Sequence, residues 1–438
     1  MARWAGNNLR RITRCPGYTA CVRCAGNEYI ATMVVFSILI SCSQKEPNQI
    51  AQRIHRVENG LIEIKSPADM LRLDSTQLAN AKTIIERMEY YKIPGVSIAV
   101  INDDRIEWTK VYGTMDVNSG APVTTETIFE AASTSKFITS VMALHFVQSG
   151  LIDLDTNVND YLKSWQIPDN EFTKDEKVTL RRLLSHRAGI PYSNYSTTGV
   201  GIPTLIDVLS GTPPAANKPA IPEFVPGSKF QYSNVAYDLI QLLLEDVSGK
   251  PFQQIAEGLV FEPLGMSNST FVYPLDSDKK QQEAMPHDAE GISREPGMPT
   301  AALAHGNLTT TPTDLATFTL EMIRSYQGKS EKILSQRTAQ QLFTIESDTD
   351  DLIKTLLPAA FDGLGVFLVG EGKDLAFAHP GTNFPGFTSW LIGWPERGTG
   401  VVIMTNGIQG HSLSMEIVSA FHREYNRTAG ESFFSPSP

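Results

Sequence analysis

Alternating, extended sequence patterns lie near both ends of the chain, and they restrict its fold more than any other feature. Residues 95–116 alternate apolar and polar side chains around Asp103-Asp104, which predicts a two-stranded hairpin. Residues 374–406 contain three further extended segments, and the stretch between these two regions is largely helical in pattern. This order predicts an α+β fold. One antiparallel sheet, flanked by helices, is built from both chain termini, and an all-helical subdomain is inserted between them.

Helical spacing is clearest in three segments. Residues 75–91 and 411–425 carry apolar side chains at helical intervals, and a longer helix is predicted over residues 133–148, with Gly150 placed to end it. The stretch 210–230 contains too many prolines for regular structure. No internal repeat is apparent.

The N-terminal segment has the order of an export signal. A basic stretch precedes the apolar run Tyr29–Ser41, which is shorter than the roughly 18 residues of a membrane-spanning helix. The quartet Leu39-Ile40-Ser41-Cys42 is similar to a bacterial lipobox, in which the cysteine is acylated. We therefore predict a protein of the bacterial cell envelope, periplasmic or extracytoplasmic, held to the membrane by a lipid anchor at Cys42. An uncleaved anchor or a misassigned start codon is the alternative.

This interpretation divides the chain into four parts. They are a signal peptide at 1–42, a polar tether at 43–75, a catalytic domain at 76–425 and a short tail at 426–438. All four cysteines (Cys15, Cys21, Cys24 and Cys42) fall in the first part, so the mature domain has none for a disulfide. The Cys21-x-x-Cys24 pair lacks the second pair or histidine that a zinc site needs, so we expect no metal and no cofactor.

The charge of the chain argues against nucleic acid as a partner. The formal net charge is -11, and residues 1–42 alone contain five arginines against one glutamate, a balance of +4. The remainder therefore carries -15, which would repel a polyanion or an anionic lipid surface. A small-molecule or peptide substrate is the expected partner instead.

A Ser-x-x-Lys spacing occurs twice, and the two copies differ in their surroundings. The first, Ser133 to Lys136, opens an apolar helical run, so both side chains would lie on one helical face, with the serine at the positive end. A lysine of lowered pKa can remove the serine proton there. The second, Ser277 to Lys280, lies in a strongly polar stretch and is predicted to be a solvated loop.

The tripeptide Tyr-Ser-Asn also occurs twice. Tyr232 follows a Pro-Gly turn and precedes a helical run, which would hold its side chain rigidly beside the core, whereas Tyr192 enters a stretch with little to fix it. A tyrosine beside the lysine is the natural third member of the site. The local sequence therefore favours Tyr232.

At this point the chain resembles a known group, the serine beta-lactamase and penicillin-binding protein superfamily, and within it the class C beta-lactamase-related serine hydrolases. The resemblance covers roughly residues 76–425 and rests on five motifs in order. They are STSK at Ser133, LLSHRAGIP at Leu183, PGSKFQYSN at Pro226, HGNLTTTPTDLATF at His305 and HPGTNFPGF at His379.

The resemblance implies a role for each matching residue. Ser133 would attack a carbonyl, Lys136 and Tyr232 would share the proton transfers, and Asn234 would position Lys136 and the substrate amide. This selects Tyr232 over Tyr192.

The last motif would supply the rest of the site. His379 would stand opposite Tyr232 and donate to it or to the substrate. The backbone N–H groups of Ser133 and Thr382 would form the oxyanion hole, and Gly381 would let the substrate approach closely. A strand-end structural histidine is the alternative for His379.

Three other positions are expected to be structural. His186 and His305 lie outside the residues to which the resemblance gives a catalytic role, and Thr311 with Pro312 and Asp314 has the pattern of a helix N-terminus.

Two departures from the pattern bear on the substrate. His-Pro-Gly stands where the family often has Lys-Thr-Gly, which removes a fixed positive charge where beta-lactams place a carboxylate. No glutamate stands in a class A-type context, so deacylation would use Tyr232 and Lys136.

We therefore predict a serine hydrolase of the beta-lactamase, D-alanyl-D-alanine carboxypeptidase or esterase type. It would form an acyl-enzyme from an ester or amide, such as a D-amino-acid or peptidoglycan-like peptide or a small ester. A class C-type beta-lactamase and a catalytically idle penicillin-binding sensor or scaffold are the alternatives. The intact set of Ser133, Lys136, Tyr232 and Asn234 counts against the idle protein.

Overall fold

The computed structural model describes residues 48–64, 78–193, 196–297 and 299–426. By its internal contacts the chain divides into two units, Met1–Ala51 and Gln52–Pro438. In the first unit only residues 48–51 are described, and they are helical. The predicted signal peptide with Cys42 and the C-terminal residues 427–438 lie outside the described residues. All that follows concerns the second unit.

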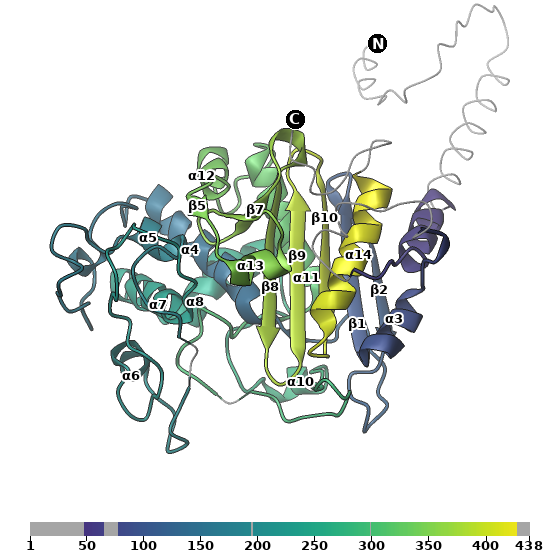
Figure 1. The fold of residues 1–438 in the computed structure, drawn as a ribbon, viewed down its shortest axis with the longest axis horizontal. Helices are drawn as coiled ribbons and strands as arrows, with labels where there is room; N and C mark the ends of the chain where they lie inside the picture. The colour runs from purple at the N-terminus through teal and green to yellow at the C-terminus, as the bar shows by residue number, and fades with distance from the viewer. Residues whose placement is uncertain (1–47, 65–77, 194–195, 298, 427–438) are drawn as a thin grey trace, which may run out of the picture. The chain divides into compact units, whose positions relative to one another are not determined.

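Among the described residues, eight strands form one antiparallel sheet in the order β2-β1-β10-β9-β8-β7-β6-β5 (Figure 1). The early strand β1 pairs with β2 on one side and with the late strand β10 on the other, so both ends of the unit build the sheet, as predicted. The strands are β1 Gly95–Asn102, β2 Arg105–Gly113, β5 Ser347–Asp348, β6 Phe361–Asp362, β7 Phe367–Val369, β8 Ala376–Asn383, β9 Phe387–Trp394 and β10 Thr399–Thr405. A separate pair, β3 Phe129–Glu130 and β4 Thr309–Thr310, lies apart from it.

The predicted hairpin is confirmed and turns where the sequence indicates. Asp103 and Asp104 connect β1 to β2 with φ of 51° and 58°. Positive φ at both central residues is the geometry whose twist matches two antiparallel strands, and aspartate tolerates it better than most side chains.

Helices cover the sheet on both faces. Every residue of β9 and β10 is buried, which requires cover on each side. The helix α11 (Pro312–Tyr326) packs on β10 and β1, and α14 (Gly410–Tyr425) packs on β9 and β10. Figure 1 shows α14 in front of the strands and α11 behind them. The predicted C-terminal helix is α14, and Thr311 caps α11 as its sequence indicates.

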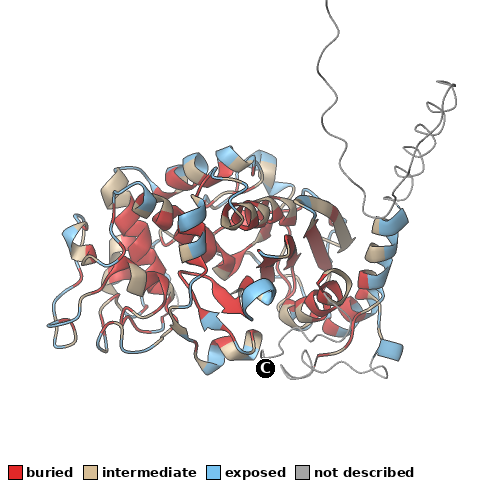
Figure 2. Ribbon diagram, turned by 90° about the horizontal axis from the view of Figure 1, so that it is seen from above, coloured by how far each residue is buried: buried red, intermediate tan, exposed pale blue. Residues whose placement is uncertain are grey.

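Much of the segment between β2 and β5 forms the predicted helical part, although the segment also contains the short strands β3 and β4 and the sheet-packing helix α11. Its central helix, α4 (Ser135–Gln148), is buried on nearly every side and packs on α7. Figure 2 shows that buried residues gather in the interior and exposed residues on the outer turns and loops. A short 3₁₀ turn, Ala132–Thr134, precedes α4, so the α-helix begins two residues after Ser133 rather than at it. The other helices are α3 Ile84–Tyr91, α5 Leu180–Leu184, α6 Leu205–Ser210, α7 Asn234–Ser248, α8 Phe252–Ala256, α9 Glu262–Leu264, α10 Ser277–Lys280, α12 Gln336–Leu342 and α13 Asp351–Leu356.

The tether predicted at 43–75 is wrong for residues 52–64, which belong to the second unit. Residues 52–58 are helical, Val57 and Leu61 are buried, and the Arg56 guanidinium donates two hydrogen bonds of 2.6 Å to Glu424 of α14. Ile54 and Val57 are three residues apart and therefore lie on one face of this helix, whereas Leu61 lies beyond it and pairs with Lys82 in an isolated bridge.

Two local expectations also change. The helix expected over 75–91 begins, in its regular part, at Ile84, because Thr83 and Glu86 form a capping box there. The second Ser-x-x-Lys copy is the short helix α10 rather than a loop, although none of its residues is buried.

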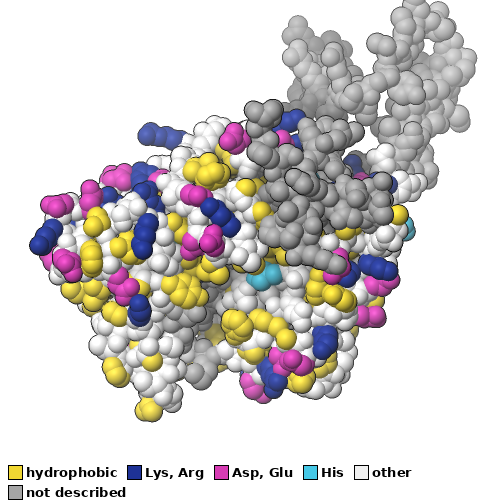
Figure 3. Space-filling model, viewed as in Figure 1, with side chains coloured by type: hydrophobic (Ala, Val, Ile, Leu, Met, Phe, Trp, Pro, Cys, Tyr) yellow, Lys and Arg dark blue, Asp and Glu magenta, His cyan; other side chains and the backbone are white. Residues whose placement is uncertain are grey.

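No helix among the described residues is long and apolar enough to cross a membrane. On the face of Figure 3, acidic and basic side chains are interspersed, without an extended area of one sign.

Candidate active site

The serine of the first motif stands on a sharp turn between β3 and α4. Ala132, directly before Ser133, has φ of 50°, a left-handed conformation that is uncommon for a residue with a Cβ. Strained residues of this kind are held in place by their surroundings and often accompany functional side chains. Here the Ser135 hydroxyl donates to the Ala132 carbonyl at 2.6 Å and accepts from the Leu308 N–H at 3.0 Å, which fixes the turn.

Lys136 is placed to act on Ser133. Its Nζ lies 3.2 Å from Ser133 Oγ and donates to the His305 carbonyl at 2.6 Å. Complete burial lowers the pKa of Lys136 to about 7, although the carboxylate of Asp238 acts in the opposite direction. The amine can therefore be neutral near pH 7 and accept a proton from the serine.

Tyr232 completes the arrangement around the lysine. Its ring centroid is 5.1 Å from Lys136 Nζ, and its phenol forms a side-chain hydrogen bond with Ser133. Burial raises the pKa of Tyr232, and the bond with Ser133 opposes the rise. Tyr232 is 8% exposed whereas Tyr192 is 45% exposed, so the copy behind the Pro-Gly turn is the one at the serine.

The ring of His186 packs against the ring of Tyr232. The two rings are 4.4 Å apart, and His186 Nδ1 accepts a hydrogen bond from the Ser233 N–H at 3.1 Å. Burial holds the pKa of His186 well below its usual value, and the nearby Lys136 lowers it further. A neutral ring bonded to the neighbouring backbone fits the structural role that the sequence analysis gives it.

The strand β8 lines the other side of the serine. The Thr134 hydroxyl donates to the His379 carbonyl at 3.0 Å, which ties the nucleophile turn to the strand. His379 is buried, and its Nδ1–H donates to the Pro380 carbonyl at 2.9 Å. Burial lowers the pKa of His379 to about 3. The side chain at the Lys-Thr-Gly position is therefore uncharged at neutral pH.

Thr382, the expected oxyanion-hole residue, is held by a side chain that the sequence analysis did not single out. The Trp390 indole N–H donates to His411 Nδ1 at 2.6 Å, so the hydrogen of the neutral ring is on Nε2 and is donated to the Thr382 hydroxyl. Burial lowers the pKa of His411 to about 4, which keeps this tautomer at neutral pH. No sequence motif marks His411, which lies on α14.

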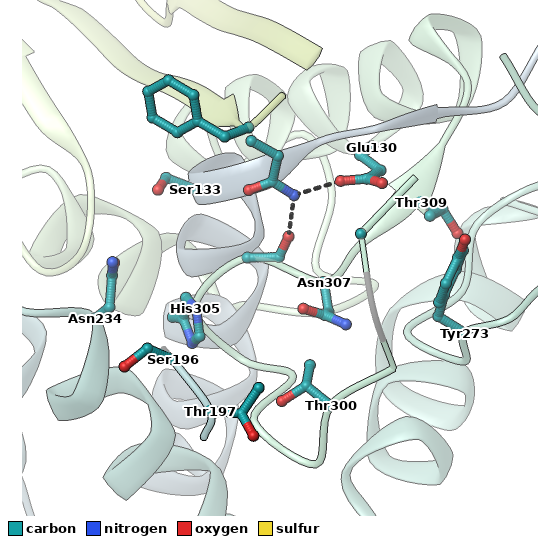
Figure 4. A pocket seen from close by; sticks show the side chains of 14 residues that line it. Glu130, Ser133, Ser196, Thr197, Asn234, Tyr273, Thr300, His305, Asn307 and Thr309 are labelled. Atoms are coloured by element: carbon teal, nitrogen blue, oxygen red, sulfur yellow. Dashed lines mark hydrogen bonds between the residues drawn. The ribbon is translucent and has the colours of Figure 1, made fainter. Parts of the chain in front are cut away.

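A pocket of about 500 Å³ opens over Ser133 (Figure 4). In the close-up, Asn234, Ser196 and His305 lie on one side, and Glu130 and Tyr273 lie on the other. No Lys or Arg is among the described residues that line it. The lining residues are Glu130, Ser133, Ser196, Thr197, Asn234, Tyr273, Gly297, Thr300, His305, Gly306, Asn307, Thr309, Asn383 and Phe384.

The structure thus brings the predicted residues of the domain together. Ser133, Lys136 and Tyr232 are in mutual contact, Asn234 lines the pocket, and residues 379–382 lie beside the serine turn. The roles given to these residues remain predictions. Two side chains of the site are not identified from the sequence. They are Asp238, which interacts with Lys136, and His411, which binds the Thr382 hydroxyl.

The chain has relatives among known proteins. The chain is similar to Protein flp of Staphylococcus aureus strain MRSA252, at 24% identity over 349 residues, 76% of this chain and 64% of that protein. It therefore spans less than two thirds of that relative's length. An N-acetylmuramyl-L-alanine amidase of Bacillus subtilis strain 168 is 24% identical over 421 residues, 86% of this chain and 90% of that protein.

Solved structures show the same fold. A beta-lactamase/D-alanine carboxypeptidase from Yersinia pestis, complexed with citrate, superposes with a TM-score of 0.63 at 19% identity, over 77% of this chain and 97% of that chain. A model of the Beta-lactamase family matches residues 80–416. The chain belongs to the beta-lactamase family, within the superfamily of serine beta-lactamases and penicillin-binding proteins.

Proposed function

We propose that this protein is a serine hydrolase that forms an acyl-enzyme at Ser133 from an ester or amide. The observation that carries the proposal is the buried Lys136 amine, 3.2 Å from Ser133 Oγ and with its pKa lowered to about 7. An amine that is neutral near pH 7 is a competent base for a serine hydroxyl. Family membership supports the same chemistry.

In the acylation step, Lys136 takes the proton of Ser133 while Oγ forms a bond to the substrate carbonyl carbon. The resulting oxyanion is stabilised by the backbone N–H groups of Ser133 and Thr382. Collapse breaks the bond to the leaving group, which receives the proton through Tyr232 or Lys136. Water then releases the acyl group as a carboxylic acid.

The charges of the pocket indicate which substrates fit. His379 is neutral at physiological pH, and no described lining residue is a Lys or Arg. A substrate carboxylate therefore lacks a fixed cation there, which disfavours true beta-lactamase activity relative to hydrolysis of neutral esters or amides. The names of the Yersinia carboxypeptidase and the Bacillus amidase favour a D-amino-acid or peptidoglycan-like amide.

We also infer that the protein acts in the bacterial cell envelope, anchored through acylated Cys42, because the quartet LISC follows an apolar run of signal length. A catalytically idle penicillin-binding sensor or scaffold is the rival from another functional class. It predicts binding without turnover.

The test is hydrolysis of a neutral 4-nitrophenyl ester, a D-alanyl-D-alanine peptide and a penicillin by the parent and by Ser133→Ala. We expect turnover of the ester or the peptide to exceed that of the penicillin, and to be lost in Ser133→Ala. Penicillin turnover above the other two would instead establish the beta-lactamase. Stable binding with no turnover of any substrate would establish the idle protein.

A further inference from the structure

We propose that His305 is a second catalytic base, which activates the water that releases the acyl group from Ser133, and that Asp238 is its positioning residue. The inference rests on the proposed function, because it requires an acyl-enzyme at Ser133. It replaces the structural role that the sequence suggests for His305. It also assigns deacylation to His305 rather than to Tyr232 and Lys136.

The first support is the pairing of His305 with a buried carboxylate. His305 Nδ1 lies 2.7 Å from Oδ1 of Asp238, which is buried on α7. A carboxylate oxygen accepts this hydrogen bond, so Nδ1 carries a hydrogen and Nε2 is the ring nitrogen left to take a proton. This is the same logic by which an aspartate orients the histidine of a Ser-His-Asp triad.

The second support is the location of the ring. The His305 carbonyl accepts the 2.6 Å hydrogen bond from Lys136 Nζ, which itself lies 3.2 Å from Ser133 Oγ. His305 lines the pocket that contains Ser133, on the side of Asn234 in Figure 4. Its side chain is 13% exposed, so water in the pocket can reach it.

The position of Asp238 follows from the sequence of α7. It comes four residues after Asn234, and residues four apart lie on one face of a helix. The face that presents Asn234 to the pocket therefore also presents Asp238 to His305. A purely structural role for His305 would be to pair with the buried Asp238, because a buried carboxylate needs a hydrogen-bonding partner. That role alone would not require His305 to line the pocket that contains Ser133.

Deacylation would proceed through one tetrahedral intermediate. His305 Nε2 takes a proton from water while the water oxygen forms a bond to the acyl carbon. The tetrahedral oxyanion collapses, the bond between that carbon and Ser133 Oγ breaks, and Oγ receives the proton that the imidazole took. The serine, the ring and a free carboxylic acid are regenerated.

The experiment separates acylation from deacylation with 4-nitrophenyl acetate in a stopped-flow instrument. The first-turnover release of nitrophenolate reports acylation, and the steady-state rate with intact-protein mass reports deacylation. In His305→Asn, the amide nitrogen can still donate to Asp238, but the base is gone. We expect its acylation rate to stay within about threefold of the parent, and deacylation to fall by roughly 10²–10⁴-fold, the range for a lost acid or base. An acetyl adduct should accumulate on Ser133.

Two further variants distinguish catalysis from support of the fold. In His305→Ala, added imidazole should restore part of the deacylation rate and leave acylation unchanged. Asp238→Asn should slow deacylation by a smaller factor, because the ring is still present but its tautomer is no longer fixed. The matched control is His145→Asn on α4, where Nδ1 contacts the Ile333 carbonyl outside the pocket, and no rate should change.

Failure of the role of His305 and failure of the proposed function give different results. An equal loss of acylation and deacylation in His305→Asn, or deacylation at the parental rate, overturns the role of His305. Failure of imidazole to restore deacylation in a folded His305→Ala overturns it as well. If the parent forms no acyl adduct and hydrolyses nothing, it is the proposed function that fails.

Discussion

Gly381 lies so close to the nucleophile turn that a Cβ on it would be 2.9 Å from the backbone nitrogen of Ser133. The same Cβ would lie 2.5 Å from the Ala131 carbonyl oxygen and 2.6 Å from the Ser389 hydroxyl. Two of these three atoms belong to the backbone and cannot move aside like the end of a side chain. Contact between β8 and the serine turn therefore requires glycine at this position.

Gly381→Ala should separate β8 from the serine turn. We expect a loss of about 1–3 kcal/mol in the free energy of unfolding, typical of overpacking. We also expect kcat to fall, because the proposed oxyanion donors, the N–H groups of Ser133 and Thr382, would move apart. The matched control is Gly258→Ala, outside the pocket, whose Cβ would meet no atom within 4 Å. Urea denaturation and ester hydrolysis measure both variants. Comparable behaviour of the two would refute the close contact at Gly381.

Covalent labelling should distinguish the two Ser-x-x-Lys copies. A fluorophosphonate or a labelled penicillin should attach to Ser133, because only that serine has a buried lysine beside it. Ser277 begins α10, which has no buried residue. Peptide mapping by mass spectrometry locates the adduct, and Ser277→Ala should label like the parent. Attachment at Ser277, or no attachment with either probe, argues against the enzyme.

Tyr232→Phe and Tyr192→Phe remove the same atom from the two Tyr-Ser-Asn copies. The first should lower kcat by roughly 10²–10⁴-fold, because in the proposed mechanism its phenol takes part in proton transfer at Ser133. The second should change kcat only by a few fold, since Tyr192 is close enough to affect Tyr232 electrostatically but is largely exposed. Ester hydrolysis is measured after both variants are shown to unfold like the parent. A larger loss at Tyr192 would reverse the assignment.

The rate should depend on pH through Lys136. Its pKa is lowered to about 7, so the neutral base predominates above that pH and kcat/KM should rise to a plateau as pH increases from 6 to 8. Lys136→Arg keeps the positive charge at every accessible pH and should be inactive throughout. A flat pH profile in the parent would mean that another group sets the rate.

The same group should make stability depend on pH. An unfolded lysine has a pKa near 10.4, so between about pH 7 and 10 the unfolded chain binds more protons than the folded one. The free energy of unfolding should therefore rise with pH in this window, by at most about 1.4 kcal/mol per unit from this residue. Lys136→Met should show a smaller slope in urea denaturation at pH 7, 8 and 9, and an unchanged slope would place the shift elsewhere.

The proposed lipid anchor can be tested at Cys42. A diacylated cysteine holds a protein to a membrane far more firmly than one chain does. Cys42→Ala should therefore move the protein from the membrane fraction to the soluble fraction, and mass spectrometry of the parent should find the acylated N-terminal peptide. Retention of the variant in the membrane would indicate an uncleaved anchor.

The sequence predicts those elements whose own residues show a hydrophobic periodicity or contain turn-forming residues. The β1-β2 hairpin follows from alternation around Asp103-Asp104, and α4 follows from its apolar run. The strands β5 and β6 have two residues each and show no period, so they exist only through pairing with their neighbours. The helix at residues 52–58 has only two apolar residues, Ile54 and Val57, among polar ones, so its sequence shows no sustained period.

The residues of the site also fall into those that local sequence identifies and those that it does not. Ser133, Lys136 and Tyr232 stand in short motifs, so their types and spacing identify them. His305 and Asp238 are 67 positions apart, and His411 is 29 positions from Thr382. Such pairs meet only when α7 and α14 are packed in place, and nothing in their local sequence shows which partner they will have.

The pairing of β1 with β10 also sets when this protein can fold. Val96 stands opposite Thr405 in the sheet, so a contact next to the beginning of the domain spans about three hundred residues. Long loops of this kind must close before the contact is gained, which slows folding and leaves apolar strands exposed in the meantime. During synthesis, β1 of the hairpin has no partner strand on the side away from β2 until β10 has been made. A chain that is exported unfolded gains from that delay, because the sheet cannot close before nearly the whole polypeptide is available.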